Sequence, residues 1–351
     1  MTAIAVVDVG PTTIADWAEM HAGSPGMTFF HGPAWAQLWQ AYSGGVFEPA
    51  PRRVEFEDGR TAILGVTLGP TRVPGIRRHH LSPQGNCGGW VSRDDLEAPH
   101  ARALAQLIID RGSVVWRRHP SDALAIEVSV PATTVETTHL IDLRDGADAA
   151  HARWRKSAAK AAAAAERRGA FVRQSTSVDD WFAYADLYER ASNRWTRPMT
   201  LYDRSLFGLL GKLEDEAVEL WIAELDGRLV AGTVNFRHGS HVVTWHGISD
   251  LSTCPGASNL LDWRMIDILA ARGIATYDLN GSGPNPGVVQ YKERIGGVAA
   301  PVLTVDRTHP LERIGRSVKR RLRGRDRRAV AGPPDPHATS RSAREAGAGH
   351  S

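Results

Sequence analysis

The sequence predicts an α/β protein, and two features of its second half predict this most clearly. Residues 150–168 hold seven alanines between positions 158 and 165 and end in an arginine pair before Gly169, which is typical of a helix and its C-terminal cap. Further on, three strand-like runs follow one another with only short turns between them, at 218–224, 228–237 and 241–248. Helices and strands therefore alternate along one chain, as in an α/β fold.

The first half of the chain predicts shorter elements. A helix over residues 30–39 is entered at Pro33 and places Trp35, Leu38 and Trp39 on one face at helical spacing. An Asp58-Gly59 turn predicts a hairpin. The expected strands lie at 53–56, 61–68, 114–117, 125–128 and 137–143, and a second helix lies at 94–111.

The second half predicts its elements in a regular order. Asp179 and Asp203 are typical helix N-caps, and Gly273 ends the helix over 257–272. The other expected helices lie at 179–190, 203–212 and 289–295, and further strands lie at 171–175, 275–279 and 302–305. The order is strand, helix, helix, three antiparallel strands, helix, strand, helix and strand.

Composition excludes several classes of protein. The 351 residues are 42% hydrophobic and 23% charged, which suits a folded chain with a sizeable core. No apolar run approaches the ~20 residues of a membrane span, and the N-terminus lacks the positive region of a signal peptide. With only Cys87 and Cys254, we expect a reducing, cytoplasmic location and no zinc-type Cys/His cluster, hence no metal.

Charge is divided unevenly along the chain. Residues 307–351 hold 12 basic and 4 acidic side chains, whereas the remaining residues hold 30 basic and 35 acidic ones. Apolar residues recur at helical spacing from Leu311 to Leu322, so we expect a short basic amphipathic helix before a disordered end. That helix would contact tRNA phosphates, contact an anionic membrane as a peripheral anchor, or pack on the folded body.

Three segments together resemble one known family. Trp154 to Val172 is similar to the basic helix-to-strand entry of the FemAB-like GNAT N-acyltransferases, and Gly256 to Trp263 to the start of their later helix. Tyr277 to Gly297 resembles their closing motif. The likeness covers residues 150–306, and the first half follows it more weakly through Gly32 to Trp35.

The resemblance implies a fold of two tandem GNAT-like domains (the acyl-CoA N-acyltransferase fold) with a basic C-terminal tail. We expect a degenerate GNAT-like domain over 1–147, a transferase domain over 148–306, and a basic helix and disordered tail over 307–351. A single sheet continuing through both halves would contradict this division. We also expect a monomer.

The resemblance further implies formation of an amide bond. The donor would be aminoacyl-tRNA or acyl-CoA, as a co-substrate with no bound cofactor, and the acceptor an amine of a small molecule or a peptidoglycan precursor. Thr253 and Ser258 replace key residues of the CoA pyrophosphate loop, which favours aminoacyl-tRNA, although Gly256, Ala257 and Ser258 still begin a helix able to bind a donor anion. An alternative from another class is a non-catalytic protein that binds nucleic acid or a membrane.

The closing motif supplies most catalytic candidates. Lys292 would stabilise phosphate or developing negative charge, unless it is a solvated helix lysine. Tyr291 would pack on the substrate or fill the edge of the domain. Asp278 would orient the incoming amine or cap the following loop. His246, expected on one strand face with Val242 and Thr244, would act as a base or be a hydrogen-bonded core histidine.

Basic residues supply the remaining candidates for substrate binding. Arg194 and Arg197 stand where the family has an arginine between two helices, and either would grip an acceptor phosphate or carboxylate. Arg78 and His80 are expected in a basic loop at the cleft between the domains, where they would hold the acceptor or be solvated.

Overall fold

The computed structural model describes residues 3–24, 26–71, 73–192, 202–213, 217–283 and 285–311. One compact unit comprises residues 1–70 and 77–307, and a second unit comprises residues 71–76 and 308–351. The expected tail helix and the disordered end lie almost wholly outside the described residues. No described helix is both long enough and apolar enough to cross a membrane.

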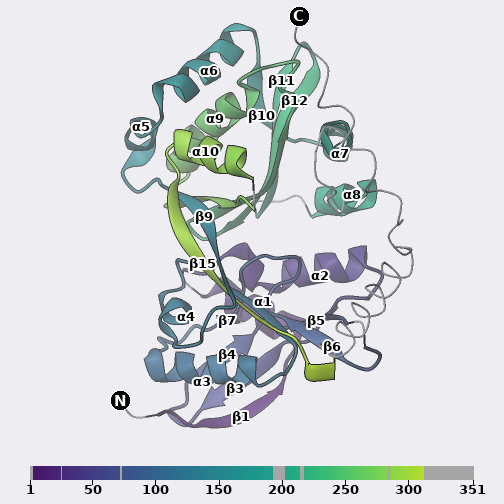
Figure 1. Cartoon of the computed structure of the whole chain (residues 1–351), viewed down its shortest axis with the longest axis vertical. Helices are drawn as coiled ribbons and strands as arrows, with labels where there is room; N and C mark the ends of the chain where they lie inside the picture. The colour runs from purple at the N-terminus through teal and green to yellow at the C-terminus, as the bar shows by residue number, and fades with distance from the viewer. Residues whose placement is uncertain are drawn as a thin grey trace, which may run out of the picture. The chain divides into compact units, whose positions relative to one another are not determined.

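Helices and strands are mixed along the described chain (Figure 1). In the first half they are β1 (Val6–Pro11), α1 (Ile14–Ala22), η1 (Phe29–His31), α2 (Pro33–Tyr42), β2 (Glu48–Pro49), β3 (Arg52–Phe56), β4 (Thr61–Leu64), β5 (Thr67–Pro70), β6 (Arg77–His80), β7 (Trp90–Val91), α3 (Ala98–Ile109), β8 (Val114–Arg118), α4 (Ala123–Glu127) and β9 (Thr134–Asp142). In the second half they are α5 (Gly146–His151), α6 (Lys156–Arg167), β10 (Phe171–Gln174), α7 (Val178–Ser192), α8 (Arg204–Lys212), β11 (Val218–Leu225), β12 (Arg228–His238), β13 (His241–Ser249), α9 (Ala257–Ala271), β14 (Thr276–Gly281), α10 (Pro286–Arg294) and β15 (Val298–Arg307).

The second half is built on the meander β10 to β13, with helices on both of its faces (Figure 1). Asp226 and Gly227 form the turn between β11 and β12 with φ angles of 52° and 70°, as a tight hairpin requires. Helices α6 and α9 pack their alanines and leucines on one face, whereas α7 and α8 cover the other. This order confirms the elements expected for the second half, apart from the single helix over 150–168.

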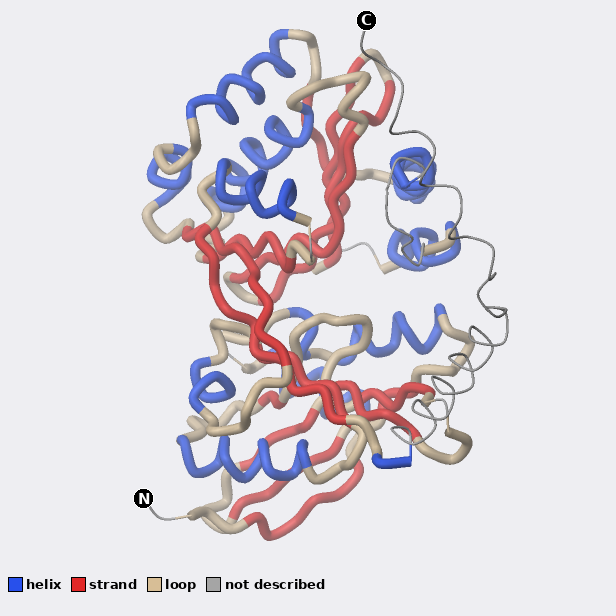
Figure 2. The backbone as a smooth tube through the Cα atoms, viewed as in Figure 1, coloured by secondary structure: helices blue, strands red, loops and turns tan. Residues whose placement is uncertain are grey.

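One sheet of 11 strands runs through both halves, so the expectation of separate sheets is wrong. β15 pairs with β9 from Val298 opposite Leu140 to Thr304 opposite Thr134, and its far end pairs with β8. β9 in turn pairs with β14. Figure 2 shows β9 and β15 as long strands that connect the two groups of strands. The last strand of the second half therefore completes the sheet of the first.

The two halves also share a core. Phe30 and Trp35 of the first half pack in one cluster with Phe236 on β12 and with the buried side chains of α7 and α8. The Trp35 and Phe236 rings lie 5.3 Å apart. The domain limits at residues 147 and 306 stay predictions.

Two expected elements have a different form. The helix over 150–168 is broken into α5 and α6, because the Arg155 N–H donates to the Arg294 carbonyl at 2.9 Å and Trp154 packs on Trp263. The strand expected at 125–128 is the short helix α4, whose N-cap Asp122 accepts from the Ala125 N–H at 2.9 Å. The first difference arises from contacts distant in sequence, whereas the second follows from a local N-cap that the strand prediction overlooked.

The first half holds a separate four-stranded sheet as well. Its order is β1-β3-β4-β7, and the hairpin of β3 and β4 confirms the turn predicted at Asp58-Gly59. The N-terminal β1 and α1 were not expected, since their sequence has few strong signals apart from Thr13, which caps α1 together with Asp16.

Candidate active site

Lys292 lies on α10 with its ammonium group against the end of β14. Nζ donates to the carbonyl oxygens of Asn280 at 2.8 Å and Gly281 at 3.0 Å. The residue is 7% exposed, so the alternative of a solvated lysine is wrong. Burial lowers the pKa of Lys292 to about 8, although the charges of Asp278 and Asp262 oppose the shift. The site therefore contains a buried cation close to its titration range.

Asp278 is buried on β14 and three donors surround its carboxylate. His119 Nε2 lies 2.9 Å from Oδ2, while Thr138 Oγ1 and the Asn280 N–H donate to Oδ1, the latter at 2.7 Å. Burial raises the pKa of Asp278, but the hydrogen bonds and charges, that of His119 first, outweigh burial and lower it. Because Asp278 accepts the Asn280 N–H, it caps the turn whose carbonyls hold Lys292. Asn280 has a φ of 59° in this turn.

β13 and β14 run parallel and separate after three pairs. The last pair is Val243 opposite Asp278, yet β13 continues to Ser249 and β14 to Gly281. Among the described strands, none pairs with the free side of β13 beyond Val243. Main-chain N–H groups in such a gap can bind a ligand oxygen, and the Lys292 ammonium lies at the Gly281 end of the gap.

A β-bulge at Trp245 interrupts the alternation of side chains along β13. Thr244 pairs with Asn235 and His246 with Val234, which leaves Trp245 as the extra residue. The expected common face of residues 242, 244 and 246 is therefore wrong. Thr244 donates to Asn235 Oδ1 at 2.7 Å, whereas His246 turns towards α7.

His246 contacts a buried tyrosine. Its Nδ1 lies 2.5 Å from the Tyr184 hydroxyl, and burial lowers the pKa of His246 to about 4. An imidazole with this pKa is neutral at pH 7 and a weak base. The geometry fits the hydrogen-bonded core alternative rather than the general base.

A second buried carboxylate was not expected from the sequence. Asp262 on α9 accepts from the Tyr277 hydroxyl at 3.0 Å and from the Tyr291 hydroxyl. Burial raises the pKa of Asp262 to about 6, although both tyrosine hydroxyls oppose the shift. Tyr291 thus points to Asp262 inside the protein rather than to an open surface. Thr244 Oγ1 extends the network, since it lies 2.9 Å from the Tyr277 hydroxyl oxygen.

The expected donor-binding residues begin α9. Gly256 is the N-cap with a φ of 90°, and a Cβ there would lie 2.4 Å from the Ala161 carbonyl oxygen. Its role is therefore to let α9 approach α6 closely. Ala257 is buried and Ser258 is partly exposed in the first turn. Donor binding by these three residues stays a prediction.

The basic candidates are not brought to Lys292. Arg78 and His80 lie on β6 and not in a loop, and the sheet order places β8, β15 and β9 between that strand and β14. Arg78 forms an ion pair with Asp306, and burial lowers the pKa of His80 to about 4. Arg194 and Arg197 lie outside the described residues.

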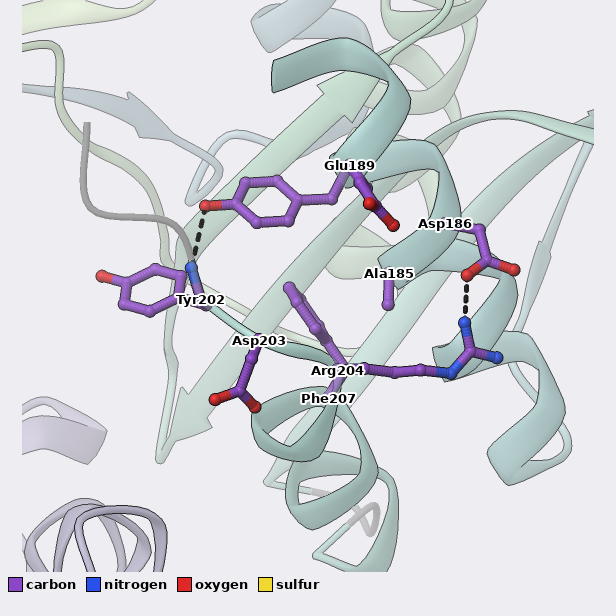
Figure 3. Close-up of a pocket in the computed structure, with 8 residues that line it drawn as sticks. Ala185, Asp186, Glu189, Tyr202, Asp203, Arg204 and Phe207 are labelled. Atoms are coloured by element: carbon purple, nitrogen blue, oxygen red, sulfur yellow. Dashed lines mark hydrogen bonds and ion pairs between the residues drawn. The ribbon is translucent and has the colours of Figure 1, made fainter. Parts of the chain in front are cut away.

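A cavity of ≈ 250 Å³ lies between α7 and α8 (Figure 3). Its walls combine aromatic rings with three carboxylates, and one of these, Asp186, pairs with Arg204. The Tyr202 N–H donates to the Tyr188 hydroxyl at 3.3 Å. The Tyr188 ring also lies 4.9 Å from the His246 ring, which connects the cavity to β13 beyond the bulge. The lining residues are Ala185, Asp186, Tyr188, Glu189, Tyr202, Asp203, Arg204 and Phe207.

Residues 150–293 match a family model described as an acetyltransferase (GNAT) domain. Over this region the chain is therefore similar to GNAT acetyltransferases. The match includes α9, the end of β14 and Lys292, which are the elements described above. A sequence search of curated proteins finds no match.

Solved structures extend the likeness to most of the chain. FemX is 12% identical with a TM-score of 0.66, over 88% of this chain and 99% of its own. L-PGS from Bacillus licheniformis is 11% identical with a TM-score of 0.52, over 85% and 93%. A C-terminal domain assigned to a lysylphosphatidylglycerol synthetase of Agrobacterium fabrum is 11% identical with a TM-score of 0.53, over 86% and 95%. These likenesses show the fold, and the FemAB-like GNAT architecture predicted from the sequence is confirmed.

Proposed function

We propose that this GNAT acyltransferase transfers an aminoacyl group from aminoacyl-tRNA to an amine acceptor. The observation that carries the proposal is the buried Lys292 ammonium, held by two carbonyls at the point where β13 and β14 separate. A buried cation beside unpaired main-chain groups suits a reaction that develops negative charge on oxygen.

The chemistry needs few groups from the protein. The neutral acceptor nitrogen attacks the ester carbonyl of the donor, and a tetrahedral oxyanion forms. The new C–N bond remains, the C–O bond to the tRNA ribose breaks, and the amine proton leaves with the ribose oxygen or to solvent. The N–H groups of β13 beyond Val243 bind the oxyanion, and Lys292 stabilises the charge on the leaving oxygen. Asp278 is a positioning residue, since it holds the turn at Asn280.

Three observations support an aminoacyl-tRNA donor. The CoA pyrophosphate loop is replaced at Thr253 and Ser258. Residues 307–351 carry a net excess of eight basic side chains, which suits a polyanionic donor. The fold is shared with FemX and L-PGS over nearly their full lengths.

The acceptor amine would enter from the cavity between α7 and α8. Its carboxylates and tyrosines suit an ammonium group, which must lose a proton before it attacks. Arg194 or Arg197, in the segment that joins these helices, would hold an acceptor phosphate or carboxylate. Both a peptidoglycan precursor and a small amine meet this description.

A second candidate is an acyl-CoA-dependent N-acetyltransferase, which the description of the matching family model favours. A third, of another class, is a non-catalytic protein that uses this fold to bind nucleic acid or a membrane through its basic tail. These candidates differ in the donor that is consumed.

Incubation of the purified full chain with a mixture of charged tRNAs, or with acetyl-CoA, distinguishes them. The acceptors offered are peptidoglycan precursors and a panel of small amines, and donor loss and amide formation are measured by mass spectrometry. We expect deacylation of tRNA that depends on the acceptor. Consumption of acetyl-CoA alone would overturn the donor assignment. Consumption of neither, with tRNA or vesicle binding retained, would favour the non-catalytic candidate.

A further inference from the structure

Three buried side chains from distant parts of the chain converge beside β14. They are His119, which follows β8, His241 at the start of β13, and Asp278 on β14. They are only 3%, 8% and 3% exposed. His119 Nε2 lies 2.9 Å and His241 Nε2 3.9 Å from Asp278 Oδ2, and the three ligating atoms all lie within 4.8 Å of one another.

His241 is not explained by contacts within the described residues. Neither of its ring nitrogens has a hydrogen-bond partner there, although both are buried. His31 Nε2 is buried and unpartnered in the same way. Repulsion from His119 and His241 contributes, after burial, to lowering the pKa of His31, so the three rings are electrostatic neighbours. Buried polar atoms without partners are costly, and their concentration here indicates a polar occupant.

We propose that His119, His241 and Asp278 bind one Zn²⁺ ion. Two imidazole nitrogens and one carboxylate oxygen are a common ligand set for zinc, with a fourth position for water. Ligands at ~2.0–2.1 Å in a tetrahedral site lie ~3.4 Å from one another. The separations of 2.9 Å and 3.9 Å lie on either side of that value, and all three atoms lie within 4.8 Å of one another, so side-chain movements can bring them to zinc distances.

The surrounding contacts suit this role. Thr138 Oγ1 and the Asn280 N–H hold Oδ1 of Asp278, which leaves Oδ2 for the ion. Without an ion, the Ser121 N–H donates to His119 Nδ1 at 3.1 Å, so Nε2 carries the proton that faces Asp278. Zinc displaces that proton, and Nδ1, once protonated, donates to the Ser121 hydroxyl 2.5 Å away, while the Ser121 N–H gives up its bond to Nδ1.

The ion would connect the two halves of the chain. His119 comes from the first half, whereas His241 and Asp278 come from the second. Because Asp278 also holds the turn that binds Lys292, the ion would stiffen this turn without contacting substrate. The proposal goes beyond the transfer reaction and does not depend on it.

The test uses the full untagged chain, stripped with a chelator and desalted. It is titrated with ZnCl₂ by calorimetry, and zinc per chain is measured by mass spectrometry after gel filtration. We expect one ion per chain and a rise in Tm that the chelator reverses. Retention of less than a tenth of an ion per chain would overturn the proposal.

Matched variants then locate the ion. His241→Ala removes a ligand that has no other partner and should abolish retention. Thr138→Val removes one hydrogen bond to Asp278 and should weaken binding ~10–100-fold. His80→Ala, a half-buried histidine on β6, should retain the ion. Equal retention in His241→Ala and the unaltered chain would show an adventitious ion only.

One measurement avoids variants that fail to fold. Co²⁺ added to the stripped, unaltered chain should give the intense visible absorption of a tetrahedral nitrogen and oxygen site, and one equivalent of Zn²⁺ should remove it. The weak absorption of octahedral Co²⁺ would contradict a site formed by these three ligands.

Discussion

Two buried aspartates, Asp278 on β14 and Asp262 on the neighbouring α9, differ in the donors that surround them. Asp262 and Asp278 are 6% and 3% exposed, so burial disfavours the charge of both. Tyr277 and Asp278 are neighbours on one strand and face opposite sides of the sheet, and Tyr277 donates to Asp262. The pKa of Asp262 is raised to about 6, because burial outweighs its two tyrosine hydroxyls, whereas that of Asp278 is lowered.

The difference shows that donor type, not depth, sets the charge at this site. Asp278 receives donors from an imidazole, a hydroxyl and a main-chain N–H. Asp262 receives two neutral hydroxyls. Both carboxylates raise the pKa of Lys292, which burial lowers to about 8. The lysine therefore has one firmly ionised neighbour and one that titrates closer to neutrality.

The largest expected effect comes from removing the cation that both aspartates face. Lys292→Ala should lower turnover ~10²–10³-fold, the usual loss for a group that stabilises transition-state charge. Lys212→Ala on α8 is the control, since that lysine is exposed. Rates are compared by amide formation, with circular dichroism to confirm the fold. Equal rates in Lys292→Ala and the control would contradict the role of Lys292.

The pH dependence of the same reaction sharpens this prediction. The Lys292 ammonium is charged below its pKa of about 8 and loses its proton above it. If catalysis needs the charge, kcat/KM calculated for the neutral form of the acceptor amine should fall above pH 8 by ~10-fold per pH unit. A value that does not fall there would contradict a requirement for the Lys292 charge.

The second effect concerns stability and compares the two aspartates directly. In Asp278→Asn, the side-chain NH₂ must face either the Asn280 N–H or His119 Nε2. His119 Nε2 also carries a proton, because Nδ1 of the same ring accepts the Ser121 N–H. An amide at position 262 meets only hydroxyls, which can accept. Asp278→Asn should therefore cost ~1–3 kcal/mol and Asp262→Asn less than ~1 kcal/mol. Urea unfolding measures both, and equal costs would contradict the comparison.

Sequence patterns predicted the helices, strands and turns around this site better than the side-chain contacts within it. Turns such as Asp226-Gly227 and caps such as Asp203 are local signals, so the meander and its helices follow from them. The closing motif likewise pointed to Lys292 and Asp278. His119, Thr138 and Asp262 carry no such signal. His119 and Thr138 reach Asp278 only because the segment after β8 and strand β9 meet β14 across more than a hundred residues, and Asp262 depends on α9 packing beside β14.

The shared sheet could not be predicted for the same reason. β15 was expected over 302–305 alone, yet it extends from Val298 to Arg307 because it has partners on both sides. Trp245 shows the converse, since period-two alternation predicts a regular strand and a bulge breaks it. Cross-strand partners decide both features, and they are not visible in one strand's sequence.

The smallest effect is a difference in pH slope between the two aspartates. The pKa of Asp262 rises from 3.8 to about 6 on folding, so the unfolded chain releases that proton first as pH rises through this interval. The free energy of unfolding should then fall with pH relative to Asp262→Asn, by at most ~1.4 kcal/mol per pH unit. Asp278 has a lowered pKa, so its stabilisation is complete above pH 3.8 and is lost only at lower pH. Asp278→Asn should therefore run parallel to the unaltered chain over the same interval. Urea unfolding between pH 4 and 6 measures the free energy of unfolding of both variants and of the unaltered chain. If the pH slope of Asp262→Asn equals that of the unaltered chain, Asp262 is already ionised in this range.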